Sequence, residues 1–261
     1  MSELETTNLK IKVAGNDIYL EKGGSGLPLI ILHNDMGGAG WVEFHNRLAQ
    51  DFTVYLPSLP GYGKSGRPEW MRSIRDMALV QNWLLKEMGI DSTNILGIGI
   101  GAWIAAEMAT MCHEQFKNMA LVSPVGLQPK SGEIIDQFLL SAEEYVELCF
   151  HDSSKFRKFF GPTPSDKQKE SWELNREMTV RVAWKPYMFN QSLPHLLPGV
   201  TTRTLIVSGS DDKVVPVSCS EHYKDILPNS RHEIIKDCGH YVDMEKPNEL
   251  AGLLIDFFKN A

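Results

Sequence analysis

A short strand that runs directly into alternating glycines constrains this chain more than any other feature. Residues 94–96 (NIL) are followed by residues 97–101 (GIGIG) and then by residues 102–111, which are rich in good helix formers. Glycine permits sharp turns and close contact between backbones. The segment is therefore predicted to form a buried strand, a tight turn and a helix.

The same alternation extends along most of the chain. Strands are predicted at 29–32, 52–56, 94–96, 119–122, 204–207 and 232–236, and helices at 41–50, 73–88, 102–111, 217–227 and 247–259. A hairpin is predicted from 9–13 and 18–20, on either side of a turn at 15–17. Strands that alternate with helices predict an α/β fold, in which a mostly parallel sheet is flanked by helices.

The alternation breaks between residues 128 and 198. This stretch contains several helical segments but no clear buried strand. It is predicted to be a helical cap, or lid, inserted into one core made of residues 1–127 and 199–261. Because ligands of open α/β sheets bind at the carboxyl ends of the strands, a cap in that place would enclose a pocket.

Net charge and composition limit the partners of this chain. The 26 Lys and Arg against 33 Asp and Glu give a net charge of −7, whereas a protein that follows nucleic-acid phosphates needs a basic face. The first residues show no signal-peptide pattern. The longest charge-free apolar stretch, 92–106, is shorter than the roughly 20 residues of a membrane helix. We expect a cytoplasmic protein without nucleic-acid or membrane partners, and the oligomeric state stays open.

Cofactors, metals and disulfides find no support in the sequence. The four cysteines have no CxxC spacing, and without a secretory signal a disulfide framework is not expected. The eight histidines are scattered without an HExxH motif, so no metal site is expected. We expect no cofactor.

Two interpretations compete for the glycines. Gly97, Gly99 and Ala102 fit the dinucleotide fingerprint G-x-G-x-x-A, but that motif belongs to the first strand of its sheet and needs an acidic residue about 20 positions later. Here at least three strands precede it, and no acidic residue ends the next strand. The other interpretation is a nucleophile elbow, G-x-S-x-G, in which Gly99 replaces the nucleophile.

Downstream motifs favour the elbow. Residues 205–216 (LIVSGSDDKVVP) are typical of a strand end that carries the acid of a catalytic triad, at Asp212 or, as the weaker alternative, Asp211. His240 follows Gly239 and precedes Glu245, as in a histidine loop. The order of elbow, acid and histidine resembles that of the α/β-hydrolase family.

The resemblance covers nearly the whole chain. Residues 32–37 (LHNDMG) resemble the oxyanion loop HG-x-x-G, with Asn34 in place of glycine, a turn residue that tolerates positive φ. Residues 57–65 (PSLPGYGKS) resemble the D-x-x-G-x-G-x-S loop, with Ser58 in place of Asp. The resemblance implies that His240 is the general base, that Asp212 orients it, and that the amides of Asp35 and Ile100 form the oxyanion hole.

Gly99 excludes a covalent serine intermediate, and three hypotheses follow. In the first, His240 acts on water or on the substrate directly, and the space left by the missing side chain holds the water. In the second, the chain is a non-catalytic protein that binds a ligand or partner. In the third, an engineered Ser→Gly change has inactivated a serine hydrolase, which the natural coding sequence would settle.

The predicted ligand is a small, largely apolar carbonyl compound, an ester, a lactone or a compound with a scissile C–C bond. Asn34, Trp103, Trp184 and Tyr187 are candidates for the pocket, although packing is the more frequent role of such aromatic residues. The Asp35 carboxylate has two interpretations, a turn cap or a second base at the pocket mouth that disfavours anionic substrates. The identity of the substrate is not predicted, since a fold does not fix function.

Overall fold

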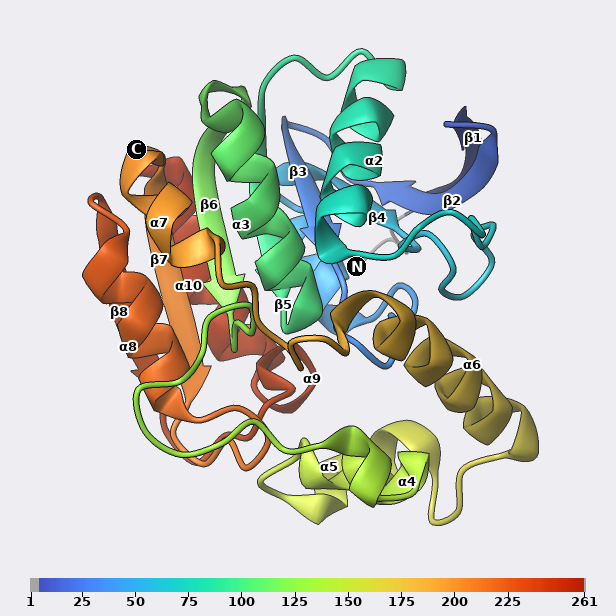
Figure 1. The fold of residues 1–261 in the computed structure, drawn as a ribbon. Helices are drawn as coiled ribbons and strands as arrows, with labels where there is room; N and C mark the ends of the chain where they lie inside the picture. Colours follow the sequence, from blue (N-terminus) through green and yellow to red (C-terminus); the bar gives the residue numbers. More distant parts are fainter. Residues whose placement is uncertain (1–4, 261) are drawn as a thin grey trace.

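The computed structural model describes residues 5–260 and contains one eight-stranded sheet (Figure 1). The strands are β1 (Thr6–Val13), β2 (Asn16–Gly23), β3 (Leu27–Leu32), β4 (Phe52–Pro57), β5 (Thr93–Ile98), β6 (Phe116–Val122), β7 (Arg203–Gly209) and β8 (Ser230–Ile235). Their order is β1-β2-β4-β3-β5-β6-β7-β8. The β1–β2 and β2–β4 pairs are antiparallel and the other pairs are parallel. The predicted mostly parallel α/β sheet is confirmed.

Helices cover both faces of the sheet. The helices of one face are α2 (Ile74–Glu87), α3 (Ile100–Cys112) and α8 (Val217–Ile226), and those of the other are α1 (Glu43–Leu48) and α10 (Pro247–Lys259). Alternate residues of β3 explain this arrangement, because Ile30 and Leu32 pack toward the first set while Leu29 and Ile31 pack toward the second. All four side chains are fully buried, which is why the strand is a continuous apolar run.

The stretch between β6 and β7 contributes no strand to the sheet, and all of it is described. It contains α4 (Ala142–Leu148), α5 (Ser153–Phe160), α6 (Asp166–Ala183) and α7 (Leu193–Leu196). Helices α4 to α6, together residues 142–183, lie beyond the carboxyl ends of the strands (Figure 1). We call them the α4–α6 segment. Its buried side chains, among them Val146 and Trp172, belong to the same apolar cluster as α2 and α3.

The chain order of the sheet creates a crevice between β3 and β5. From β3 the chain moves outward to β4 and then crosses to β5 on the other side of β3. The loops that leave β3 and β5 therefore diverge, and ligands of open α/β sheets bind at such a switch point. Residues 33–37 follow β3 and Gly99 follows β5, so both predicted site segments lie at this crevice.

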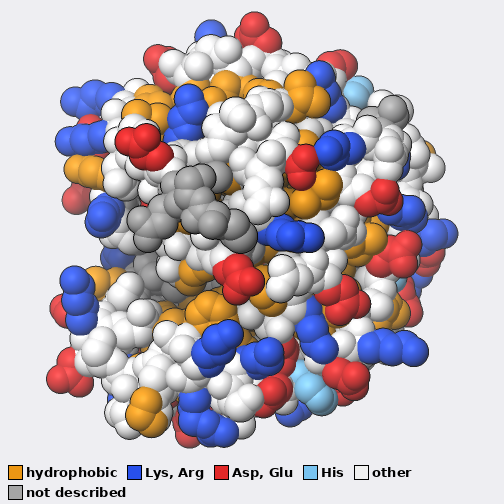
Figure 2. Space-filling view, turned by 180° about the vertical axis from the view of Figure 1, so that it is seen from behind, with side chains coloured by type: hydrophobic (Ala, Val, Ile, Leu, Met, Phe, Trp, Pro, Cys, Tyr) orange, Lys and Arg blue, Asp and Glu red, His pale blue; other side chains and the backbone are white. Residues whose placement is uncertain are grey.

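The molecular surface is mixed in charge on the face that is turned away in Figure 1. Lysine and arginine side chains are interspersed there with aspartate and glutamate (Figure 2). Among the helices of residues 5–260, none has the length and apolar character needed to cross a membrane.

Candidate active site

Gly99 joins β5 to α3 in the backbone conformation of a strained turn. Its φ is 55° and its ψ is −116°, a region in which side chains are rare and glycine is favoured. A Cβ at Gly101 would collide with the carbonyl oxygen of Leu32, and one at Gly97 with the backbone of Gly101 and Ala102. The two outer glycines are therefore required by the close approach of α3 to β3 and β5.

A side chain at Gly99 would point at His240. A Cβ built on Gly99 lies 3.4 Å from Nε2 of His240 and 3.4 Å from Cβ of Asn34, with nothing closer. These are ordinary contact distances, so a methyl-sized group or a water molecule fits there. The backbone at Gly99 forms a sharp strand-to-helix turn whose central residue has no side chain.

His240 and Asp212 form a buried pair. Nδ1 of His240 lies 2.8 Å from Oδ2 of Asp212, and both side chains are 2% exposed. The other oxygen of Asp212 accepts the backbone N–H groups of Val214 and Val215 at 2.9 and 2.8 Å. Because the carboxylate fixes the proton on Nδ1, Nε2 is the basic nitrogen that faces Gly99. The weaker alternative, Asp211, points instead toward His151 on the surface.

Glu245 holds the histidine loop in place, a role that sequence reasoning did not assign. Its buried carboxylate accepts the N–H groups of Gly239 (2.7 Å), Asp152 (2.7 Å) and His151 (3.1 Å). The loop that carries His240 is thus tied to the chain between α4 and α5. The sequence does carry a signal for Glu245, because a glutamate five residues after His240 is part of the histidine-loop motif.

The loop after β3 runs beside Gly99, where Cβ of Asn34 lies 3.4 Å from a Cβ built on Gly99. His33 lies behind it and accepts the N–H of Leu59 on Nε2, and its Nδ1 is 2.8 Å from the carbonyl oxygen of Asn34. Burial lowers the pKa of His33 to about 4, so the ring is neutral and structural. Asn34 accepts the N–H of Met36 in a local turn, at a backbone φ that is not positive. The expected use of positive φ at Asn34 is thus wrong, and the turn takes that conformation at Gly37.

The α4–α6 segment is hydrogen-bonded directly to this loop. Thr179 donates to the carbonyl oxygen of Asp35 at 2.7 Å, and Asn175 donates to that of Met36 at 2.8 Å. Tyr145 donates from its hydroxyl to Oδ2 of Asp35 at 2.8 Å. Sequence reasoning missed these three residues, because polar side chains on helices more than 100 positions away carry no motif.

Burial and charge oppose each other at His240. Burial disfavours the imidazolium and lowers its pKa, but the charge of Asp212 and the hydrogen bond to it raise the pKa above 6.5. A base with a raised pKa is neutral only toward higher pH. Proton abstraction by His240 is therefore favoured toward higher pH.

The His240–Asp212 pair and the neighbouring Asp35 are enclosed. His240 and Asp35 are each 1% exposed. A cavity of about 320 Å³ lies next to the site, and its lining includes Asn34, Met36, Trp172 and Tyr241. The lining of this cavity does not include His240, and the His240 and Asp212 side chains are each 2% exposed, so the described residues shield the pair from solvent.

A family model for the alpha/beta hydrolase fold matches residues 26–247. The chain belongs to this family. Its strand order, elbow and histidine loop agree with that membership, and the elbow interpretation of the glycines holds against the dinucleotide one, since the motif follows the fifth strand of the chain.

Three similar proteins indicate how far the likeness to other α/β-hydrolases reaches. A 2-hydroxymuconate semialdehyde hydrolase of Pseudomonas sp. (strain CF600) is 22% identical, over 97% of this chain and 94% of its own. The dihydrolipoyllysine-residue acetyltransferase component of the acetoin cleaving system of Cupriavidus necator is 25% identical over 90% of this chain, which spans 64% of its length. The solved 2-hydroxy-6-oxo-6-phenylhexa-2,4-dienoate hydrolase of Rhodococcus sp. strain RHA1 superposes with a TM-score of 0.80 at 19% identity, covering 98% of this chain and 99% of that one.

None of the three aromatic pocket candidates lines the cavity next to the site of this α/β-hydrolase. Trp184 is 48% exposed and packs against Phe138 and Tyr187 on the surface, which corrects the expectation that it lines the pocket. Trp103 donates to buried Glu107 and borders a different cavity, near the start of α2. The Tyr187 hydroxyl donates to the carbonyl oxygen of Ile135. Of the four candidates, only Asn34 borders both Gly99 and the adjacent cavity.

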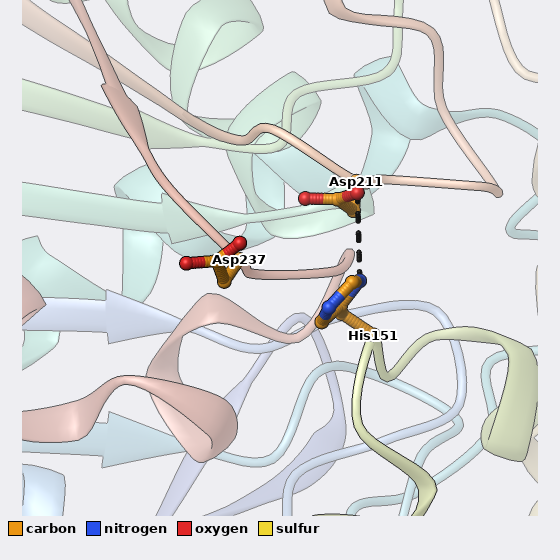
Figure 3. Close-up of side chains that lie close together, drawn as sticks. All are labelled: His151, Asp211 and Asp237. Carbon is orange, nitrogen blue, oxygen red and sulfur yellow. Dashed lines mark ion pairs between the residues drawn. The ribbon is translucent and has the colours of Figure 1, made fainter.

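Three metal-ligating side chains converge at the rim of the sheet of this α/β-hydrolase. His151, Asp211 and Asp237 approach one another within 4.8 Å, from the chain before α5 and from the ends of β7 and β8 (Figure 3). His151 and Asp211 form an ion pair at 3.5 Å, each more than a third exposed. An exposed pair of this kind contributes about 1 kcal/mol at most.

Proposed function

We propose that this α/β-hydrolase hydrolyses a small, largely apolar carbonyl compound without a covalent intermediate. The observation that carries the proposal is the free Nε2 side of His240, which faces an elbow whose side chain is missing. In this proposal His240 is the general base and Asp212 its orienting partner. The amides of Asp35 and Ile100 receive the oxyanion, and Ile100 opens α3, so its N–H has no partner within the helix.

The nucleophile in this mechanism is water held in the space beside Gly99. Nε2 of His240 takes a proton from that water as its oxygen bonds to the carbonyl carbon, and the oxyanion forms against the two amides. The imidazolium then returns the proton to the leaving group. General base catalysis contributes about 10²–10⁴-fold, and preorganised amides add to it.

The names of similar proteins favour one of the three candidate bonds. The Pseudomonas relative is named a 2-hydroxymuconate semialdehyde hydrolase and the Rhodococcus structure a 2-hydroxy-6-oxo-6-phenylhexa-2,4-dienoate hydrolase. Neither named compound contains an ester or lactone bond, so its hydrolysis has to break a C–C bond. We therefore rank C–C hydrolysis first, ahead of esters and lactones. Residues 128–198 are proposed to act as the cap over a core of residues 1–127 and 199–261, because α4–α6 lies over the site and bonds to its loop.

A non-catalytic binding function is the second candidate. The missing nucleophile and the enclosed position of the pair favour it. A binder has no need for the His240–Asp212 pair, however, and that pair is intact. The intact His240–Asp212 pair is therefore the reason that hydrolysis is proposed ahead of binding.

Turnover by wild type and His240→Ala separates the two candidates. The probes are 2-hydroxy-6-oxo-6-phenylhexa-2,4-dienoate, followed by loss of its chromophore, and p-nitrophenyl butyrate. We expect the wild-type rate to rise with pH through a pKa above 6.5, as neutral His240 accumulates. His240→Ala should fall to the background rate, and His195→Ala, which removes an exposed histidine on α7, should match wild type.

Two results would count against hydrolysis by His240. Turnover that is indifferent to His240→Ala would refute the mechanism. Calorimetric binding of either probe without any product, retained in His240→Ala, would establish the binding function instead.

A further inference from the structure

The side chain of Asp35 is placed unusually for a loop carboxylate. It is 1% exposed, and its Oδ2 accepts the hydroxyl of Tyr145 at 2.8 Å. Its Oδ1 is buried without a hydrogen-bond partner among the described residues. Because burying an unpaired carboxylate oxygen is costly, such a group calls for a functional explanation.

The surroundings of Asp35 favour its neutral form. Burial raises the pKa of Asp35, while the charge of His240 and the hydrogen bond from the Tyr145 hydroxyl lower it in part. The titratable groups that interact with it are His240, Tyr62, Tyr145, Cys149, Tyr187 and Tyr241. Burial raises the pKa of each of these tyrosines and of the cysteine, so they stay uncharged. His240, which faces Asp212 and Asp243 as well, is the one group in this set that can carry a positive charge.

We propose that the Asp35 carboxyl group is the catalytic acid that works opposite His240, a role that rests on the proposed function. Oδ2 is occupied by the Tyr145 hydroxyl, so the proton of the neutral carboxyl resides on Oδ1, the oxygen without a partner. The backbone amide of the same residue is the proposed oxyanion donor. In this proposal the carboxyl group and the amide of Asp35 act on the same substrate oxygen.

The reaction balances with one water and no other reactant. Nε2 of His240 removes a proton from water, the new O–C bond forms, and the carbonyl oxygen takes the proton of Asp35, which gives a gem-diol. The imidazolium then protonates the leaving atom as the scissile bond breaks. The Asp35 carboxylate recovers a proton from one hydroxyl of the diol as the C=O bond re-forms.

This role narrows the substrate class to carbonyl compounds that are uncharged beside the reacting carbon. A substrate carboxylate placed there would meet the negative charge that Asp35 acquires during the reaction. Neutral esters and diketones avoid this repulsion. The neutral p-nitrophenyl butyrate is therefore the suitable probe for the test.

The first test asks whether Asp35 is protonated, and it does not depend on turnover. The infrared difference between wild type and Asp35→Asn at pH 7 should contain the C=O stretch of a protonated carboxylic acid. A difference spectrum that contains only carboxylate bands would overturn the proposal. Circular dichroism establishes that the variant is folded.

The second test uses the pH dependence of kcat/KM for p-nitrophenyl butyrate. Wild type should give a bell, because His240 must be neutral and Asp35 protonated, with apparent pKa values that belong to the pair. Asp35→Asn keeps an N–H donor but cannot transfer a proton. We expect it to lose about 10²-fold in rate and the basic limb of the bell.

Two further variants test which titrating group gives rise to each limb of the pH profile. Tyr145→Phe removes a hydrogen bond that favours the charged form of Asp35, so the basic limb should move to higher pH. Asp243→Asn is the matched control, a buried carboxyl with a pKa raised to about 6 that also interacts with His240. It should move the acidic limb to lower pH and leave the basic limb in place.

The outcomes distinguish this inference from the proposed function. A basic limb that persists in Asp35→Asn, together with a rate within 3-fold of wild type, would overturn the acid role while His240-dependent turnover still supports hydrolysis. Turnover that is unchanged in His240→Ala would refute the proposed function itself. The infrared difference would still show whether Asp35 is protonated.

Discussion

At the scale of residues, Gly99 leaves the centre of a sharp strand-to-helix turn without a side chain. Glycine adopts φ 55° and ψ −116° without the steric cost that a side chain incurs there, and the glycines at 97 and 101 keep the turn tight. His240 and Asp212 remain paired beside it. The proposed general base therefore faces a turn that has no side chain at its centre.

Gly99→Ser is expected to restore a serine nucleophile. Its Cβ would lie 3.4 Å from Nε2 of His240, so its hydroxyl can reach that nitrogen. The backbone strain should cost about 1–3 kcal/mol of stability. A fluorophosphonate probe, which labels activated serines, should react with Gly99→Ser and not with wild type.

Gly99→Ala is the matched control for this prediction, because it has the same strain and no hydroxyl. It should stay unlabelled, and it should also lower the hydrolysis rate of wild type by filling the space proposed for water. A folded Gly99→Ser protein that resists the probe would contradict the elbow geometry.

At the scale of elements, the sequence was sufficient for nearly all strands and helices. Parallel strands buried on both faces, such as β3, are continuous apolar runs, and glycine ends α2 after Met88. The sequence also predicted which segments carry Gly99, Asp212 and His240, because each lies in a local motif. It did not predict which helices bond to the oxyanion loop, because that depends on packing between distant segments.

The approach of α3 to β3 makes Gly101 irreplaceable. In Gly101→Ala the new methyl group would collide with backbone oxygens of Leu32 and His33, which cannot move without displacing the strand. We expect a loss of about 3 kcal/mol or more in the free energy of unfolding, measured by urea titration with circular dichroism.

Gly252→Ala tests the same glycine-to-alanine replacement at a position where the added methyl group has space. Gly252 is exposed within α10 and has no atom within 4 Å of an added Cβ, so helix propensity should stabilise the protein by about 0.5–1 kcal/mol. Equal stabilities for Gly101→Ala and Gly252→Ala would contradict the close contact of α3 with β3 at Gly101.

At the scale of the whole molecule, the site is assembled from segments far apart in the chain. The loop after β3, the turn after β5, the histidine loop and α6 meet at one end of the sheet (Figure 1). The contacts of Tyr145 and Thr179 with Asp35 span 110 and 144 residues. Such contacts leave no periodic pattern in the sequence. The sequence therefore predicted the proposed catalytic pair but not the helices α4 and α6 that lie over it.

Because His240, Asp212 and Asp35 are enclosed, we expect a ligand to enter when α6 separates from the loop after β3. Asn175 bonds to the carbonyl oxygen of Met36 and to the N–H of Gly63, and it is 5% exposed. Asn175→Ala should remove about 1–3 kcal/mol from this contact and speed hydrogen exchange in residues 33–38 and 59–66 about 5- to 150-fold. Leu174→Ala, on the exposed side of the same helix, should exchange like wild type. Equal exchange in the two variants would mean that α6 does not gate the site.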